Sequence, residues 1–209
     1  MALFQDPSSR WCLLAPMTYS VLLLVYVILQ FIAFFFVLVA TPIEVLVERN
    51  PLLGGVLACF TLWGYKLRCH SLDYVFTIDQ EFSDCPVVIH RFRAAQAFAI
   101  ISIFVYGAAF ILGSILLYGC SFLRWVCLAL NIVGIATLCV VWAAMAVTYN
   151  KEEGRFCPAI KDDGTYAAGF VLFVIAWILD IINTFMLLLP CTVPATKPPE
   201  KVESPTAEE

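Results

Sequence analysis

Charged side chains are scarce in this chain of 209 residues, where Asp, Glu, Lys and Arg make up only 13% of the sequence. Soluble domains carry about 25%. Hydrophobic residues reach 62%, which is more apolar material than a water-soluble domain of this size hides in one core. The net charge of −4 is small, and there is no basic cluster that could follow a phosphate backbone. The composition therefore argues against nucleic-acid binding and indicates a lipid bilayer as the surrounding solvent.

Four long segments are almost free of charge. A helix needs about 20 apolar residues to cross about 30 Å of hydrocarbon, and in lipid its backbone groups must pair with one another. We therefore predict four membrane-spanning helices, at residues 20–40, 94–118, 125–149 and 167–189. Asp180 is the one charged residue within them.

The first span could instead be a secretory signal peptide, because it ends at the small residue Ala40. Signal peptides, however, have an apolar core of about 7–15 residues, and both their last residue and the residue two places before it are small. Here the apolar run from Val21 to Ala40 is longer, and the earlier position is the bulky Leu38. We therefore favour a retained helix.

The segments outside the spans differ in length and composition. The tail is rich in Pro, Lys and Glu, and such a segment is expected to be disordered. The predicted segments are an N-terminus at 1–19, a first loop at 41–93, a tight turn at 119–124, a second loop at 150–166 and the tail at 190–209.

The first loop contains strand signals. Residues 43–48, 56–67 and 74–78 are rich in β-branched and aromatic side chains, and turn-forming residues separate them. We therefore expect an all-α integral membrane protein, a four-transmembrane-helix bundle, with a small extracellular β-sheet in the first loop.

Two signals disagree about orientation. The two loops hold eight Lys and Arg residues against four on the other side, which by the positive-inside rule places the loops in the cytoplasm. The loops also hold an even number of cysteines, as suits disulfide formation in an oxidising compartment. These are Cys59, Cys69, Cys85 and Cys157. Since the rule is weaker for long loops, we follow the cysteines and predict a multi-pass plasma-membrane protein with both termini in the cytoplasm.

The stretch CFTLWGYKLRC at residues 59–69 resembles the signature of the amastins, surface proteins of kinetoplastid parasites. Arg68 departs from that pattern, which has an acidic or amide residue or Thr there. The run FRAAQAFAIISIFVYGAAF also resembles the second amastin helix, so the likeness covers nearly the whole chain. The matching signature residues are Cys59, Phe60, Thr61, Leu62, Trp63, Gly64, Lys66 and Cys69.

The resemblance implies a surface tetraspan protein without enzymatic activity, distantly similar to claudins. Its implied partners are the lipid bilayer, a host membrane or surface protein, and further copies of the chain. Trp63 is interpreted as a packed anchor of the sheet. The chain has no Asn-x-Ser/Thr sequon, so N-glycosylation is not expected.

The loop cysteines have two interpretations. Strands joined by a turn near Gly64 could bring Cys59 and Cys69 within the Cα separation of about 4.4–6.8 Å that a disulfide needs. We predict that bond and a second one, Cys85–Cys157, which would clip the second loop to the first. The alternative is a metal site, although no C-x2-C spacing supports zinc. Its ligands would be Cys69, His70, Cys85, His90 and Cys157.

Asp180 lies near the middle of the fourth span, where a carboxylate costs about 2.5–3.5 kcal/mol on insertion scales. Asn183 shares its helical face. We interpret this face as forming interhelical hydrogen bonds, with Asn131 or Gln30 as the partner of Asp180. The alternative is a small transporter or a proton- or ion-handling protein centred on Asp180.

Recognised catalytic motifs are missing from the sequence, which has no G-x-S-x-G, H-E-x-x-H or P-loop. We predict no enzyme, no cofactor and no resident metal. Three further cysteines near span ends, Cys12, Cys120 and Cys191, are candidates for palmitoylation.

Overall fold

The computed structural model describes residues 16–50, 56–69, 71, 73–118, 122–153, 157, 159–162 and 164–189. The predicted tail at 190–209 and the palmitoylation candidates Cys12, Cys120 and Cys191 lie outside the described residues.

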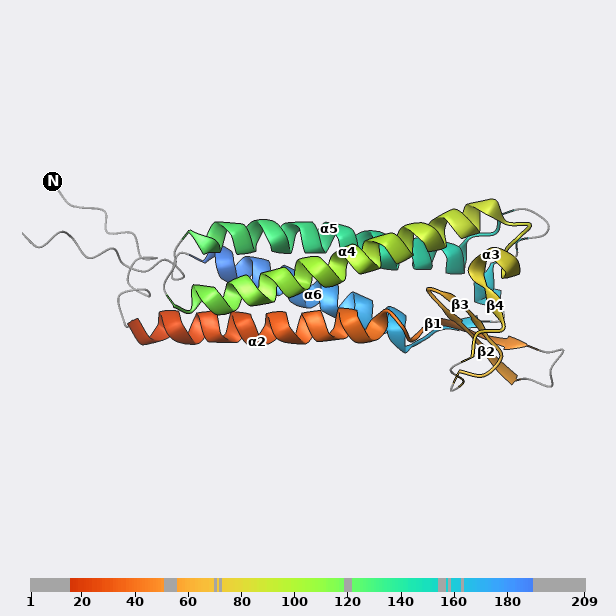
Figure 1. The fold of residues 1–209 in the computed structure, drawn as a ribbon, viewed down its shortest axis with the longest axis horizontal. Helices are drawn as coiled ribbons and strands as arrows, with labels where there is room; N and C mark the ends of the chain where they lie inside the picture. Colours follow the sequence, from red (N-terminus) through yellow and green to blue (C-terminus); the bar gives the residue numbers. More distant parts are fainter. Residues whose placement is uncertain are drawn as a thin grey trace, which may run out of the picture.

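Four long helices form an elongated bundle (Figure 1). All four are long and apolar enough to cross a membrane. They pack in a ring in which α2 contacts α4, α4 contacts α5, α5 contacts α6, and α6 returns to α2. The predicted four-helix fold with a small sheet is confirmed. The bounds are α2 Pro16–Ala40, α4 Pro86–Leu116, α5 Leu123–Asn150 and α6 Ala168–Leu188.

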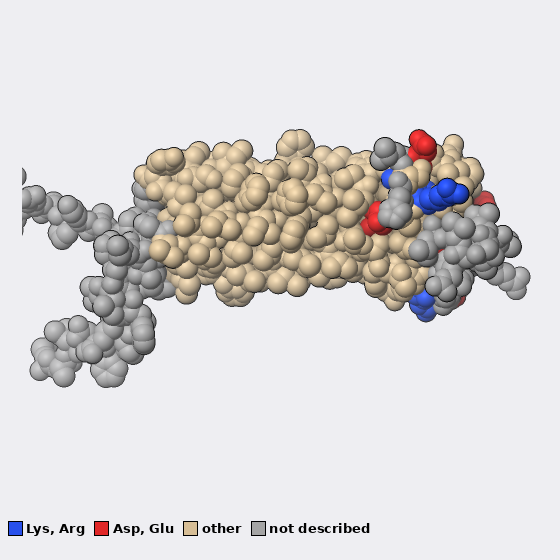
Figure 2. Space-filling model, turned by 90° about the horizontal axis from the view of Figure 1, so that it is seen from below, with Lys and Arg blue, Asp and Glu red and all other residues tan. Residues whose placement is uncertain are grey.

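Large apolar side chains cover the outside of the bundle. Phe104, Trp125 and Phe185 are 72%, 67% and 65% exposed, a state that lipid rather than water would accommodate. On the long face in Figure 2, the described Lys, Arg, Asp and Glu residues gather towards one end. That distribution is expected when a hydrocarbon slab surrounds the middle of the bundle.

A five-stranded antiparallel sheet lies at the end of the bundle where α2 ends and α4 begins, called the sheet end here (Figure 1). Its strand order is β4-β3-β2-β1-β5. The opposite end, where α4 leads to α5, is the turn end. The strands are β1 Glu44–Asn50, β2 Val56–Thr61, β3 Gly64–Lys66, β4 Phe76–Thr77 and β5 Gly164–Tyr166.

The sheet differs from the prediction in one strand. The expected sheet was confined to the first loop, but β5 comes from the second loop and pairs with β1, with Leu46 opposite Tyr166. A strand of three residues is too short to show the alternation by which strands are recognised in a sequence. The pairing joins the two loops into one layer.

The helix bounds also depart from the predicted spans. Helix α4 begins at Pro86, well before residue 94, because Pro is favoured in the first helical turn. Its first turns carry Arg91 and Arg93, so the helix continues beyond the apolar span into the layer of loops and strands at the sheet end. A short helix, α3 Ile78–Glu81, and a 3-10 turn, η2 Ile160–Asp162, complete that layer.

Candidate functional site

The signature residues form the hairpin between β2 and β3. The Oγ1 atom of Thr61 accepts hydrogen bonds from the backbone N–H groups of Trp63 and Gly64, both at 3.1 Å. The same hydroxyl donates to the carbonyl of Gly64 at 3.0 Å. A methyl group added at Gly64 would lie 2.8 Å from the carbonyl oxygen of Phe76 and from the ring of Tyr74. Thr61 therefore closes the turn, and Gly64 leaves room for β4.

Two signature residues tie the hairpin to the helices. The indole N–H of Trp63 donates to the carbonyl of Thr41, just beyond α2, at 3.1 Å. The carbonyl of Leu62 accepts from Nε2 of Gln96 on α4 at 2.6 Å, and the Leu62 side chain is fully buried. The hydrogen bond to Thr41 thus supports the interpretation of Trp63 as an anchor.

Lys66 is a signature residue that turns inward although it carries a charge. It is 9% exposed, and its ammonium group lies 4.8 Å from the centre of the Tyr74 ring. A cation over an aromatic face is attracted by the negative electron density of the ring. Arg68, where the sequence departs from the signature, is exposed and lies outside this packed set.

The structure places a disulfide between Cys59 and Cys69, with Cα atoms 5.3 Å apart, and another between Cys85 and Cys157, with Cα atoms 6.0 Å apart. The first closes the signature hairpin. The second joins the start of α4 to the second loop. Among the described residues, no group of three or more His, Cys, Asp or Glu is arranged to hold a metal ion. His70, one of the alternative metal ligands, lies outside the described residues.

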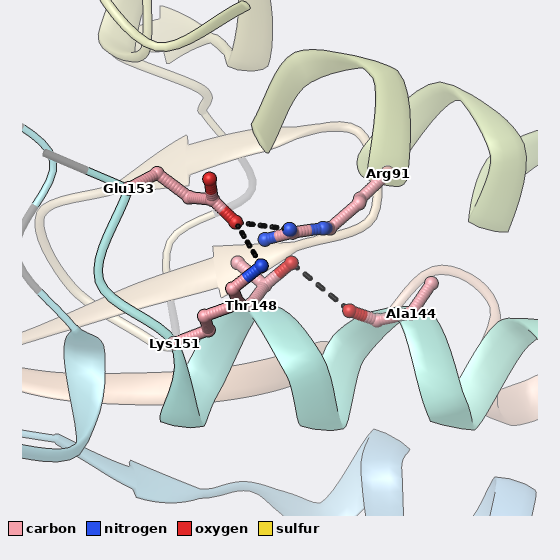
Figure 3. Close-up of polar contacts among 5 residues, drawn as sticks. All are labelled: Arg91, Ala144, Thr148, Lys151 and Glu153. Atoms are coloured by element: carbon pink, nitrogen blue, oxygen red, sulfur yellow. Dashed lines mark hydrogen bonds and ion pairs between the residues drawn. The ribbon is translucent and has the colours of Figure 1, made fainter. Parts of the chain in front are cut away.

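An ion-pair cluster adds a further link between α4 and the second loop (Figure 3). Arg91 on α4 donates to the carboxylate of Glu153, and the ammonium group of Lys151 lies 3.4 Å from the same oxygen atom. The hydrogen bond from Arg91 holds the pKa of Glu153 below its ordinary value, and Lys151 adds to the effect. On the other side of the loop, the hydroxyl of Tyr149 donates to the carbonyl of Gly164 at 3.1 Å.

Large apolar side chains are exposed at the free edge of the sheet. Tyr74, Val75 and Phe76 are 45%, 43% and 47% exposed, and we call them the outer strip. The strip belongs to strand β4 and the residues before it. The sequence predicts a strand in this segment but not its exposure. The exposure comes from the position of β4 at the edge of the sheet, where it has a neighbouring strand on one side only. Exposed acidic residues lie close to the strip in sequence, namely Asp73, Asp79, Glu81 and Asp84.

A second candidate site lies inside the bundle, around Asp180. This side chain is fully buried, and neither carboxylate oxygen has a hydrogen-bond partner among the described residues. The expected bond to Asn131 or Gln30 is therefore not formed in the described part of the chain. Instead, the side-chain amide of Asn183 donates to Oε1 of Gln30 at 2.7 Å, which joins α6 to α2.

The neighbours of Asp180 approach it closely. A methyl group added at Gly134 on α5 would lie 2.7 Å from Oδ2 of Asp180 and 2.9 Å from the ring of Tyr106 on α4. The Tyr106 hydroxyl lies next to the carboxyl group, although the two do not meet in hydrogen-bond geometry. Gly134 is thus the residue that lets α5 approach the carboxyl group.

A family model described as "Amastin surface glycoprotein" matches residues 31–187. The matched range begins within α2, includes the signature hairpin and both disulfides, and ends at the last turn of α6. A search of curated proteins finds no match to the chain.

Proposed function

Because the chain belongs to the amastin family of surface membrane proteins, we propose that it acts by contact at the plasma membrane. The sheet end faces outward, both termini face the cytoplasm, and the outer strip meets a host membrane, lipid or protein partner. The role is one of adhesion or recognition and involves no catalysis.

The exposure of the outer strip is the observation that carries this proposal. Large apolar groups that form a patch on a surface mark interaction sites. The bilayer around the bundle does not account for their exposure, because exposed Asp73 and Asp79 flank the strip at the sheet end. The two disulfides support an outward sheet end, since such bonds persist in oxidising compartments.

The acidic neighbours of the strip favour one class of partner. Asp73, Glu81 and Asp84 would repel an anionic lipid surface and attract basic groups, whereas Asp79 is already paired with Arg93 of α4. Partial burial raises the pKa of Glu81 without cancelling the acidic character of the group as a whole. A protein that presents apolar side chains ringed by Lys or Arg therefore fits the strip better than an anionic membrane does.

The signature hairpin supplies rigidity in this scheme. The side chains of Thr61 and Lys66 make contacts within the protein. Gly64 allows a close approach of β4 because it has no side chain. A rigid support lowers the entropy lost on binding. We therefore assign contact to the outer strip and support to the signature.

The test uses the purified protein in lipid nanodiscs and measures binding to intact host cells. Tyr74→Ser combined with Phe76→Ser should weaken binding about tenfold or more, since buried aromatic anchors each contribute over 1 kcal/mol at interfaces. Val87→Ser serves as the matched control, because it changes an apolar residue that is 45% exposed on α4 at the sheet end. Equal binding by the double variant and the control would contradict the proposal.

Two added measurements identify the partner class. Binding to protein-free liposomes would indicate a lipid partner, whereas binding that protease treatment of the host cells abolishes would indicate a protein. Light scattering of the purified protein tests the remaining partner, a second copy of the chain.

A second candidate function is proton or ion handling centred on Asp180, and the buried carboxyl group without a described partner favours it. Acidification of liposome interiors tests it. Proton flux that is present in the wild type and absent in Asp180→Asn would favour transport over contact. No flux in either, with normal surface levels of the variant, would leave the contact function.

A further inference from the structure

Six buried polar side chains meet at one level of the bundle, and we call them the polar layer. Each is at most 1% exposed, and all four helices contribute. They are Tyr26 and Gln30 of α2, Tyr106 of α4, Asn131 of α5, and Asp180 and Asn183 of α6.

The polar layer has more hydrogen-bonding groups than bonds. Apart from the Gln30–Asn183 bond, donors and acceptors of the layer lack partners within the described ranges. Such groups cost several kcal/mol each in hydrocarbon. The unpaired donors are the two tyrosine hydroxyls and the amide nitrogens of Gln30 and Asn131; the unpaired acceptors are the oxygens of Asn131, Asn183 and Asp180.

An ionised Asp180 would have no countercharge within reach. In the described helices, Lys, Arg and His occur only near the ends, at His90, Arg91 and Arg93 of α4 and at Arg124 of α5. Arg124 is engaged at the turn end, where its guanidinium donates to the carbonyl of Leu187. The titratable groups that face Asp180 are the hydroxyls of Tyr26 and Tyr106, with the thiol of Cys127 beside Tyr26. All three are neutral in their ordinary state.

Apolar residues separate the polar layer from both ends of the bundle. Towards the sheet end, the buried hydrogen bond from Ser102 of α4 to Thr137 of α5 continues the polar contacts by one helical turn. Beyond it lies an apolar cluster that includes Ala99, Val141 and Phe173. Towards the turn end, Leu23 and Leu187 pack together with Leu116. The layer is therefore enclosed rather than part of a continuous polar path through the bundle.

The packing around the carboxyl group limits what can bind there. Oδ2 of Asp180 lies so near Gly134 that even a methyl group would overlap with it. A metal cation needs several oxygen ligands around it. The close approach of Gly134 leaves no space for such a shell beside Oδ2 on the α5 side. A proton is the one cation that neutralises a carboxylate without needing a coordination shell.

From this geometry we propose that Asp180 is an enclosed proton-binding site, occupied at neutral pH. The carboxylate takes up one proton from hydronium in the solvent: one O–H bond forms on the carboxyl group, one breaks in hydronium, and water is left. The neutral acid then forms a hydrogen bond with the Tyr106 hydroxyl, which lies beside it. This site does not depend on surface contact through the outer strip.

Infrared spectroscopy of the protein in lipid nanodiscs tests the proposal. The carbonyl band of a protonated carboxylic acid should be present at neutral pH in the wild type and missing in Asp180→Asn, which keeps the side-chain shape. Tyr106→Phe should keep the band and shift its frequency, because it removes the hydrogen-bonding neighbour. This second variant keeps the test decisive if Asp180→Asn does not fold.

Two results would overturn the proposal. One is a wild-type band that appears only below about pH 4, where an ordinary Asp titrates. The other is thermal stabilisation by sodium or potassium chloride in the wild type but not in Tyr106→Phe or Asp180→Asn, which would assign the site to an alkali cation. Neither result bears on binding through the outer strip, so the two proposals fail independently.

Discussion

At the scale of single residues, the polar groups inside the bundle are paired to different extents: the side chains of Ser102 and Thr137 share a hydrogen bond, as do those of Gln30 and Asn183. The Gln30–Asn183 bond joins α2 to α6, whereas Asp180 meets no described donor. The two helices also pack closely at Gly169 of α6, where an added methyl group would lie 3.2 Å from the carbonyl oxygen of Ala40. One side-chain hydrogen bond is therefore a small part of the stability of this contact.

We predict that Asn183→Leu lowers the free energy of unfolding in detergent by about 0.6–2 kcal/mol. The stability falls because Leu cannot donate a hydrogen bond to Gln30. Measured interhelical hydrogen bonds in membranes average about 0.6 kcal/mol. A double-mutant cycle with Gln30→Leu should give a coupling energy of that average size. Zero coupling would show that the two amides do not pair.

At the scale of elements, the second loop is held to the rest of the sheet end by three kinds of contact. These are the β1–β5 pairing, the Cys85–Cys157 bond and the Arg91–Glu153 ion pair. The disulfides differ most in the length of chain they close, since the bonded cysteines are 72 positions apart in one case and 10 in the other.

Removing the long-range disulfide should destabilise the fold more than removing the local one. Loop-closure entropy predicts a loss of about 4 kcal/mol for Cys85→Ser and about 3 kcal/mol for Cys59→Ser, before strain is counted. Chemical unfolding of both variants measures the difference. Peptide mapping without reductant provides the check on pairing, and four free thiols in the wild type would refute both bonds.

Stability should also respond to acid through Glu153. Its pKa in the folded protein lies below the ordinary value, so its ion pair stabilises the fold above about pH 4.3, where an unfolded Glu is ionised. That contribution is lost as the pH falls through the folded pKa. The wild type should therefore melt higher than Glu153→Gln at neutral pH, and the two melting temperatures should converge on acidification. A difference that persists in acid would contradict this assignment.

At the scale of the whole molecule, one end carries the sheet, the disulfides and most of the described charge, and the middle is apolar (Figures 1 and 2). The excess of Lys and Arg in the loops argues for the opposite orientation from the disulfides. Most of these loop cations lie in the long first loop, for which the positive-inside rule is weaker.

Antibody staining of intact cells decides the orientation. A tag after Glu209 should be detected only after permeabilisation, because we place both termini in the cytoplasm. A second tag inserted between Asn50 and Val56 should be detected on intact cells. The reverse pattern would place the sheet end in the cytoplasm and would remove the basis for surface contact by the outer strip.

Much of this fold could be predicted because lipid imposes simple rules. Backbone groups in hydrocarbon must pair locally, so long runs without charge become helices whatever their partners are. The β-branched segments of the first loop likewise led to β1 and β2 without knowledge of the bundle. The signature stretch 59–69 indicated the family through residue types at fixed spacing, and the family match covers it.

Other features were decided by the tertiary structure alone. Strand β5 exists because β1 offers it an edge, and its three residues have no pattern of their own. The outer strip is exposed because β4 is the last strand, a fact that its apolar sequence conceals. The choice of Asn183 rather than Asp180 as the partner of Gln30 depends on how α2 and α6 are rotated against each other. Sequence therefore determined which segments enter the membrane, because that is a transfer of local composition between solvents. Only packing in three dimensions decided which polar groups pair inside the bundle and which, like the carboxyl group of Asp180, have no partner among the described residues.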